Sequence, residues 1–190
     1  MEMDFASMPY WAVAAGVLGL LVAFYFASSV LKKSPGNARM QEISNAIQEG
    51  AMAYLNRQYR TLIPFVVIIF IVLLFVSWEM AISFVVGAVA SAIAGYVGMS
   101  ITTRANARTT EAARTSLNSA LGVSFRAGAV MGLSVAGLGL FGVSLLYVIF
   151  RDPEIINSFA FGASAIALFA RVGGGIYTKA ADVGADLVGK

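Results

Sequence analysis

The sequence of 190 residues is 59% hydrophobic and 12% charged, and its mean hydropathy of +0.81 is too high for a soluble globular domain. It contains no cysteine and no histidine, which excludes disulfides, thiolate or imidazole metal sites and histidine-dependent catalytic triads. Any bound metal therefore needs oxygen ligands, which favours Mg²⁺ or Ca²⁺. The net charge of +3 comes from basic residues placed between apolar runs, so we predict a membrane protein with no nucleic-acid partner.

Five apolar runs in chain order are long enough to cross a bilayer, whose hydrocarbon core of about 30 Å needs roughly 20 helical residues. They lack the two-residue alternation of barrel strands, and lipid offers no partner for unpaired backbone groups. We therefore predict an all-α, polytopic transmembrane helix bundle that forms a single region. Its expected spans are residues 10–31, 51–77, 80–101, 122–150 and 155–177, followed by a cytoplasmic substrate-binding segment, 178–190.

The segment between the first two spans carries apolar residues at intervals of three and four, at Met40, Ile43, Ile47, Ala51 and Tyr54. This spacing is typical of a helix with one apolar face. We expect the segment to continue into the second span, which would then protrude into the cytoplasm.

Lysine and arginine residues fall almost entirely on one side of the predicted bundle. Twelve of them lie between the first span and the start of the second, between the third span and the start of the fourth, or near and after the end of the fifth. The other side holds only Arg151. Because basic loops stay in the cytoplasm, we predict that the N-terminus lies outside and that residues 178–190 are cytoplasmic.

Small residues recur at helical spacing in the third and fourth spans, and we interpret these stripes as close helix packing. They are Gly87, Ser91 and Gly95, and Gly128, Gly132 and Ala136.

Two nucleotide-binding patterns also occur. The G-x-G-x-x-G of Gly137, Gly139 and Gly142 lies inside a predicted span, whereas the dinucleotide motif requires a strand-to-helix turn, so we reject it. The G-x-x-x-x-G-K from Gly184 to Lys190 has no strand before it and is a weak phosphate-loop match.

The last residues of the sequence contain a cluster of charged side chains that could bind a ligand. If they are helical, Lys179, Asp182, Asp186 and Lys190 share one face, because they are three, four and four residues apart. Two carboxylates one turn apart can hold a hard divalent cation, and the flanking lysines can bind phosphate oxygens. The pattern indicates half of a magnesium phosphate site. An ordinary solvated helix face has the same spacing.

Arg171 lies about 24 Å along the fifth helix, counted from Ile155 at about 1.5 Å per residue, near the inner edge of the hydrocarbon. Its side chain either extends to the interface or pairs with an acid on another helix, which is the usual mark of an ion path. The glycines from Gly173 to Gly175 allow a close backbone approach or a hinge.

The run from Arg171 to Lys190 resembles the hydrolytic-site signature of the membrane-integral, ion-translocating inorganic pyrophosphatases over all of its residues. Three segments upstream are also similar to that family: residues 87–99, 103–108 and 131–135. The resemblance implies hydrolysis of pyrophosphate at the cytoplasmic face, coupled to outward pumping of H⁺ or Na⁺. It implies Mg²⁺ as a cofactor, with K⁺ as a second candidate, and a homodimer in a prokaryotic cell membrane rather than a vacuolar one.

The resemblance also implies roles for single residues. Lys179, Asp182 and Lys190 would bind the substrate, Asp182 and Asp186 would organise magnesium, and Arg171 would belong to the ion pathway. Members of the family have about sixteen helices, since only helices can complete such a bundle in lipid. We therefore expect this chain to be the N-terminal portion of a longer protein, with the water-activating carboxylates beyond Lys190, and to be inactive alone.

Two other classes of protein fit the same residues. One is a non-hydrolytic ion carrier or channel subunit, which would transport ions without pyrophosphate. The other is an assembly or scaffold protein, which would tolerate the loss of Asp182 and Lys190.

Overall fold

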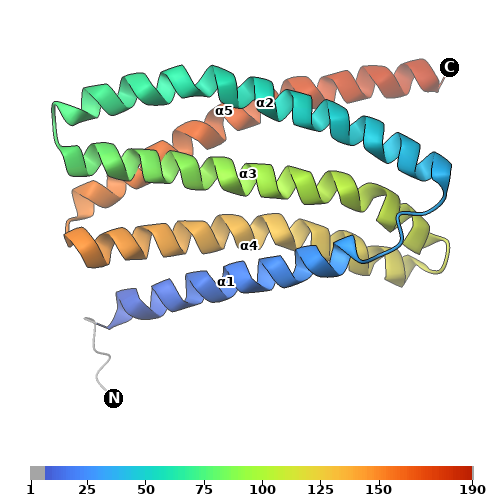
Figure 1. Cartoon of the computed structure of the whole chain (residues 1–190), viewed down its shortest axis with the longest axis horizontal. Helices are drawn as coiled ribbons and strands as arrows, with labels where there is room; N and C mark the ends of the chain where they lie inside the picture. The colour runs from blue at the N-terminus through green and yellow to red at the C-terminus, as the bar shows by residue number, and fades with distance from the viewer. Residues whose placement is uncertain (1–6, 190) are drawn as a thin grey trace.

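A computed structural model describes residues 7–189, and these fold into five long α-helices with no strand among them (Figure 1). Each helix contains an apolar window long enough to cross a membrane, which confirms the predicted all-α, polytopic bundle. The helices are α1 (Met8–Leu31), α2 (Ala38–Leu74), α3 (Trp78–Ala113), α4 (Leu117–Phe150) and α5 (Pro153–Val188).

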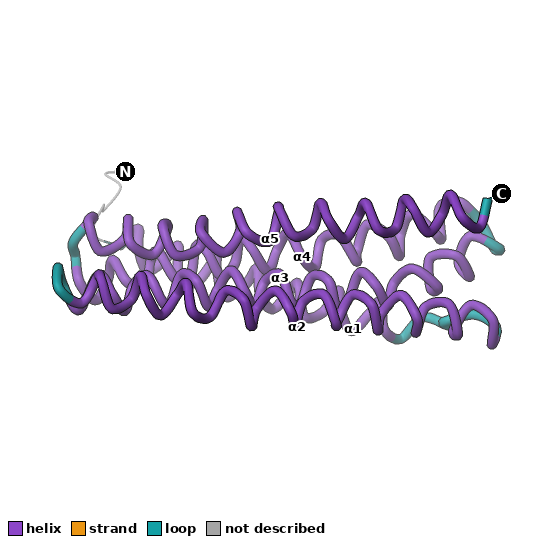
Figure 2. Tube along the Cα trace, turned by 90° about the horizontal axis from the view of Figure 1, so that it is seen from above, coloured by secondary structure: helices purple, strands orange, loops and turns teal. Residues whose placement is uncertain are grey.

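The helices lie side by side with α3 in the middle, where it contacts each of the other four. The helix α1 packs mainly against α4, and α2 packs mainly against α3. The last helix, α5, runs obliquely across α3 (Figure 1). Figure 2, turned by 90°, shows α5 along one face of the bundle.

Short connections join the helices, and side-chain oxygens cap most of the first turns. An oxygen at the residue before the helix accepts a backbone N–H in four of the five cases, which satisfies one of the donors that a helix start leaves unpaired. The capping residues are Asn37, Ser77, Ser116 and Asp152. Arg151 ends α4 in the left-handed conformation, with φ of 54°, and starts the sharp turn into α5.

The second helix is continuous from Ala38 to Leu74, so residues 40–54 form a helix that runs into the second span, as predicted. The helix continues through Pro64 without a break. The helix α5 is also unbroken through the glycines from Gly173 to Gly175. The helices α2, α3 and α5 extend well beyond the apolar spans that composition predicts, whereas α1 and α4 nearly match theirs.

Two helix crossings depend on glycine. Where α3 meets α5, a Cβ atom on Gly87 would overlap the carbonyl group of Phe159, and a Cβ atom on Gly162 would overlap that of Phe84. Where α1 meets α4, a Cβ atom on Gly16 would lie 2.8 Å from the backbone nitrogen of Phe141. Only glycine lets the backbones approach this closely, and such contacts replace the hydrophobic effect as the source of helix association in lipid.

The small-residue stripes are only partly used for packing. Gly87 packs as predicted, but no described atom lies within 4 Å of a Cβ atom built on Gly128 or Gly132. Within residues 7–189 the α4 stripe therefore packs against no other helix, and its role in close packing stays a prediction. The helix instead turns Gly137 toward Leu20 and Gly16 of α1, and Gly142 toward Phe159.

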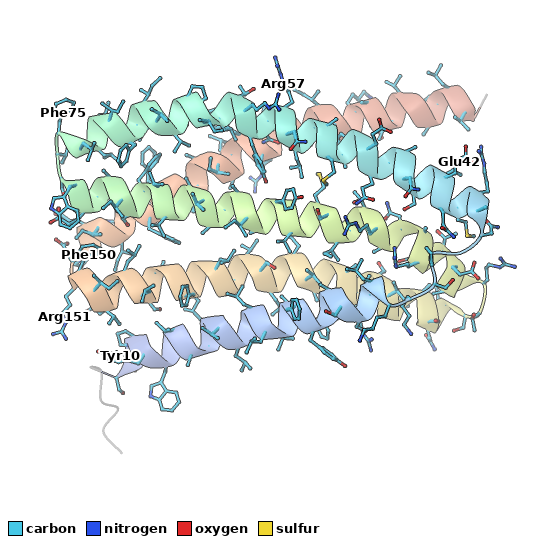
Figure 3. The ribbon with its side chains drawn as sticks, in the orientation of Figure 1. Tyr10, Glu42, Arg57, Phe75, Phe150 and Arg151 are labelled. Carbon is cyan, nitrogen blue, oxygen red and sulfur yellow. The ribbon has the colours of Figure 1, made fainter. Side chains whose placement is uncertain are left out.

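The two ends of the bundle differ in charge. Phe75, Phe150 and Arg151 lie at the end where α1 begins, and Glu42 lies at the opposite end (Figure 3). That opposite end carries residues 32–37, residues 114–116 and the last turns of α5 (Figure 1). The structure therefore places both basic connections and the charged α5 extension at the same end.

Candidate functional site

The last turns of α5 extend free of the other helices of the described chain. Every residue from 178 to 189 is exposed, in contrast to the first half of α5, which buries residues such as Phe159 and Ile166. Lys179, Asp182 and Asp186 all belong to this exposed part, whereas Lys190 lies outside the described residues. The predicted site residues are therefore presented to the medium at the basic end of the bundle.

Lys179 and Asp182 form a loose pair, with Nζ 4.0 Å from Oδ2 and side chains that are 78% and 60% exposed. A pair this exposed contributes about 0–1 kcal/mol to stability, because water screens it and both side chains lose freedom. Asp186 follows Asp182 by one helical turn on the same helix. The structure thus places these three charges on consecutive turns, and nothing in their contacts gives them a structural role.

The described residues provide a partial set of magnesium ligands. No group of three or more acidic residues that could hold a metal occurs between residues 7 and 189. Asp182 and Asp186 nevertheless offer the hard oxygen ligands that Mg²⁺ prefers, and Mg²⁺ is commonly held by one or two carboxylates together with substrate phosphates. The pair therefore fits a magnesium ion whose other ligands include phosphate oxygens.

Arg171 lies two turns before Lys179, on the stretch of α5 that leaves the bundle. Its side chain lines two grooves, one of about 600 Å³ beside Phe65 and Phe161, and one of about 570 Å³ between α3, α4 and α5. The walls of the second groove are mostly small or apolar, with Gly95 and Ala167 among them. None of the salt bridges among residues 7–189 involves Arg171, so its charge faces these grooves without a described counter-ion.

Tyr54 of α2 contacts α5 next to Arg171. Its hydroxyl donates a hydrogen bond to the carbonyl oxygen of Ala170 at 3.3 Å, and its ring centroid lies 5.3 Å from that of Tyr177. A Cβ atom on Gly173 would lie 2.8 Å from the same hydroxyl oxygen, so at this glycine the Tyr54 side chain, rather than another backbone, approaches α5 closely. Sequence reasoning found Tyr54 only as the last apolar position of residues 40–54.

A cavity of about 220 Å³ lies next to this contact, between α2, α3, α4 and α5. Its lining combines polar groups from α2 and α3, including Gln58 and Thr102, with the backbone of α5 at Ala170 and Gly174. The amide atoms of Gln58 are buried. Sequence reasoning missed Gln58, because a single polar residue near the start of an apolar span gives no periodic signal.

Arg108, in the segment 103–108 that resembles the family, has a structural role. Its guanidinium donates to the carbonyl oxygen of Arg104 at 2.7 Å and to that of Leu31 at 3.4 Å, which ties α3 to the end of α1. Burial, and next the neighbouring charge of Arg104, lower the pKa of Arg108. Arginine titrates so far above neutrality that the group stays charged.

Five apolar helices with a charged extension at the basic end define a multi-pass α-helical membrane protein. The family model described as Inorganic H⁺ pyrophosphatase matches residues 17–190, which is most of the chain. The chain therefore belongs to the inorganic H⁺ pyrophosphatase family.

Curated relatives include pumps for two different ions. A K⁺-insensitive pyrophosphate-energized proton pump of Methanosarcina mazei is 53% identical over 184 residues, which cover 95% of this chain and 27% of the relative. A putative K⁺-stimulated pyrophosphate-energized sodium pump of Clostridium tetani is 54% identical over 182 residues, with the same coverage of 95% and 27%. The chain thus spans about a quarter of the length of these relatives.

Proposed function

We propose that the intact protein hydrolyses inorganic pyrophosphate at the cytoplasmic face and uses the reaction to pump H⁺ or Na⁺ outward. The observation that carries the proposal is the family match from residue 17 to residue 190, which includes the whole charged segment of α5. Relatives named as proton pumps and as sodium pumps match about equally well, so the pumped ion is one of these two.

The charged face of α5 supplies the first part of the substrate site. Lys179 and Lys190 neutralise phosphate oxygens, Asp182 helps to orient the substrate, and Asp182 and Asp186 hold Mg²⁺. When bound, Mg²⁺ would neutralise charge on pyrophosphate and polarise its phosphoryl oxygens. Exposure of residues 178–189 supports this assignment, since a highly charged substrate can reach them directly.

Arg171 links the substrate site to the ion pathway. It lies two turns before Lys179 on the same rigid helix and faces the grooves between the membrane helices. A cation at this depth repels a passing cation unless an acidic partner compensates it, so it can control when an ion moves. The contact of Tyr54 with Ala170 supports this role, because it holds the Arg171 turn in place.

The surroundings of the protein follow from the same relatives. Methanosarcina mazei and Clostridium tetani are prokaryotes, which supports a prokaryotic cell membrane. The basic end of the bundle supports a cytoplasmic location for residues 178–190 and an external N-terminus. One relative is named K⁺-insensitive and another K⁺-stimulated, so K⁺ is a second candidate cofactor. A homodimer completes the proposal, on the basis of the family resemblance alone.

Reconstitution of the intact protein into liposomes tests the proposed function. Pyrophosphate and Mg²⁺ added at the cytoplasmic face should release phosphate and acidify the lumen or load it with Na⁺, and removal of Mg²⁺ should stop both. Ion movement that needs no pyrophosphate would instead show a carrier or channel. The 190 residues alone should release no phosphate, because they hold no third carboxylate near Asp182 and Asp186 within the described range.

A further inference from the structure

A polar pocket lies between the end of α1 and the start of α4, away from the charged face of α5. It has a volume of about 200 Å³ and is found at the basic end of the bundle. Its polar and small lining residues come from the two helices and the first connection: Ser29, Lys33, Asn118, Ser119, Gly122 and Arg126.

The chemistry of this pocket suits an anion with several oxygens. Lys33 and Arg126 bring two positive charges to its wall, Asn118 and Ser119 add side-chain donors, and no acidic residue lines it. Arg126 is held in place by a hydrogen bond of 2.7 Å from its guanidinium to the hydroxyl oxygen of Ser29. Neither basic residue takes part in a salt bridge among residues 7–189. Guanidinium and ammonium groups placed in this way bind phosphate oxygens through charge-assisted hydrogen bonds.

The position of the pocket indicates that the phosphate would come from a lipid headgroup rather than from a free anion. It lies where α1 ends and where the predicted fourth span begins. Because apolar spans end at the membrane surface, lipid headgroups would lie at this level. Large apolar side chains on both helices are exposed next to it: Tyr25 lies one turn before Ser29, and Leu121 and Phe125 adjoin Gly122 and Arg126. Acyl chains can lie along these residues while the headgroup occupies the pocket, as basic pockets between membrane helices do with anionic lipids.

We propose that this pocket binds the phosphate group of an anionic membrane lipid. The bound lipid would bridge α1 and α4 at the membrane surface. This inference does not rest on pyrophosphate hydrolysis, because it uses none of the residues assigned to the substrate or to the ion pathway.

Gly122 allows a test that leaves every charge in place. Apart from the backbone of its own helix and its chain neighbours, nothing lies within 4 Å of a Cβ atom on Gly122, so the side chain of Gly122→Leu can extend from this open position into the pocket. Gly128→Leu is the matched control, since Gly128 lies on the same helix, has an equally open Cβ position, and is not in the pocket. We expect both variants to fold, because neither Cβ position meets another helix within residues 7–189.

A second pair of variants tests the charges. Lys33→Gln combined with Arg126→Gln removes both cations of the pocket, whereas Lys32→Gln combined with Arg114→Gln removes two cations from the same end of the bundle but not from the pocket. The two double variants have equal net charge. Any difference between them therefore reports the pocket rather than the general potential of the surface.

The measurement is titration of the delipidated intact protein with phosphatidylglycerol or phosphatidylcholine of the same acyl chains, followed by native mass spectrometry. We expect preferential binding of phosphatidylglycerol, weakened about tenfold or more by Gly122→Leu and by the pocket double variant, and nearly unchanged in both controls.

Three results would overturn the proposal. One is unchanged phosphatidylglycerol binding in Gly122→Leu, and another is equal weakening in both double variants. The third is displacement of phosphatidylglycerol by millimolar inorganic phosphate, which would identify a site for a free anion.

Discussion

The charged residues near the end of α5 are highly exposed and make few contacts. Their substitution should therefore change activity without much change in the free energy of unfolding. Lys179 and Asp182 form one weak pair, and the surrounding residues 178–189 are exposed. Exposed positions of this kind usually change the free energy of unfolding by no more than about 0.5 kcal/mol. A loss of activity in such variants therefore reports chemistry rather than misfolding.

We predict that Asp182→Asn, Asp186→Asn, Lys179→Met and Lys190→Ala each abolish pyrophosphate hydrolysis by the intact protein at saturating Mg²⁺. The first three should change the free energy of unfolding by less than about 0.5 kcal/mol, because they lose no tertiary contact within residues 7–189. Glu154→Gln, in the first turn of the same helix, is the control and should keep full turnover. Turnover that survives in the Asp182 and Asp186 variants would show that this face is simply solvated.

We expect Arg171 to affect the coupling between pyrophosphate hydrolysis and ion transport. In Arg171→Ala, the number of ions transported per pyrophosphate should fall, because the charge facing the grooves between α3, α4 and α5 is removed. The ratio is measured in proteoliposomes from phosphate release and ion uptake in the same sample. Arg171→Lys, which keeps a positive charge, should retain more coupling than Arg171→Ala. An unchanged ratio in Arg171→Ala would refute the role in the pathway.

Among the elements, the crossing of α3 and α5 matters most for the site, because it fixes the direction in which α5 leaves the bundle. Gly87 and Gly162 face each other across this crossing, each against the backbone of the opposite helix. Backbone atoms cannot move aside as a flexible side chain can. The crossing therefore tolerates no side chain at either position.

We predict that Gly87→Ala and Gly162→Ala each lower the free energy of unfolding of the intact protein by about 1–3 kcal/mol, the usual cost of overpacking. Gly175→Ala on α5 should be neutral or slightly stabilising, since nothing lies within 4 Å of its Cβ position and alanine favours a helix. Unfolding in mixed detergent measures all three variants. Equal stability of all three would show that the crossing is less tight than described.

On the scale of the whole molecule, the distribution of charge along the bundle sets its orientation in the membrane. Both basic connections and the α5 extension lie at one end, and Arg151 lies at the other. The positive-inside rule then predicts that Lys179, Asp182 and Asp186 lie in the cytoplasm, where we propose that pyrophosphate binds.

Labelling of introduced cysteines measures this orientation, because the 190 residues contain no cysteine of their own. In intact cells, a membrane-impermeant maleimide should label Val76→Cys, which lies in the connection at the Arg151 end. Thr115→Cys, in the connection at the basic end, should react only after the cells are permeabilised. The opposite pattern would invert the proposed topology.

Local sequence was sufficient to predict the five apolar spans and the spacing of the charged residues. The length of an apolar run and the three-and-four spacing of Lys179, Asp182 and Asp186 depend on neighbours in the chain, so they can be read from the sequence. The identity of the packed glycines could not be read in this way. Gly128 looks as suitable for packing as Gly162, but only Gly162 meets another backbone.

The sequence by itself determined that this protein is a bundle of membrane helices with most of its basic residues toward one end, because solvent preference acts on each segment separately. Only the tertiary structure decided that Tyr54 holds the Arg171 turn, that glycines close two crossings, and that Lys33 and Arg126 share a pocket. These contacts join residues far apart in the chain. Their formation depends on how the helices rotate and cross, and no local pattern specifies those angles.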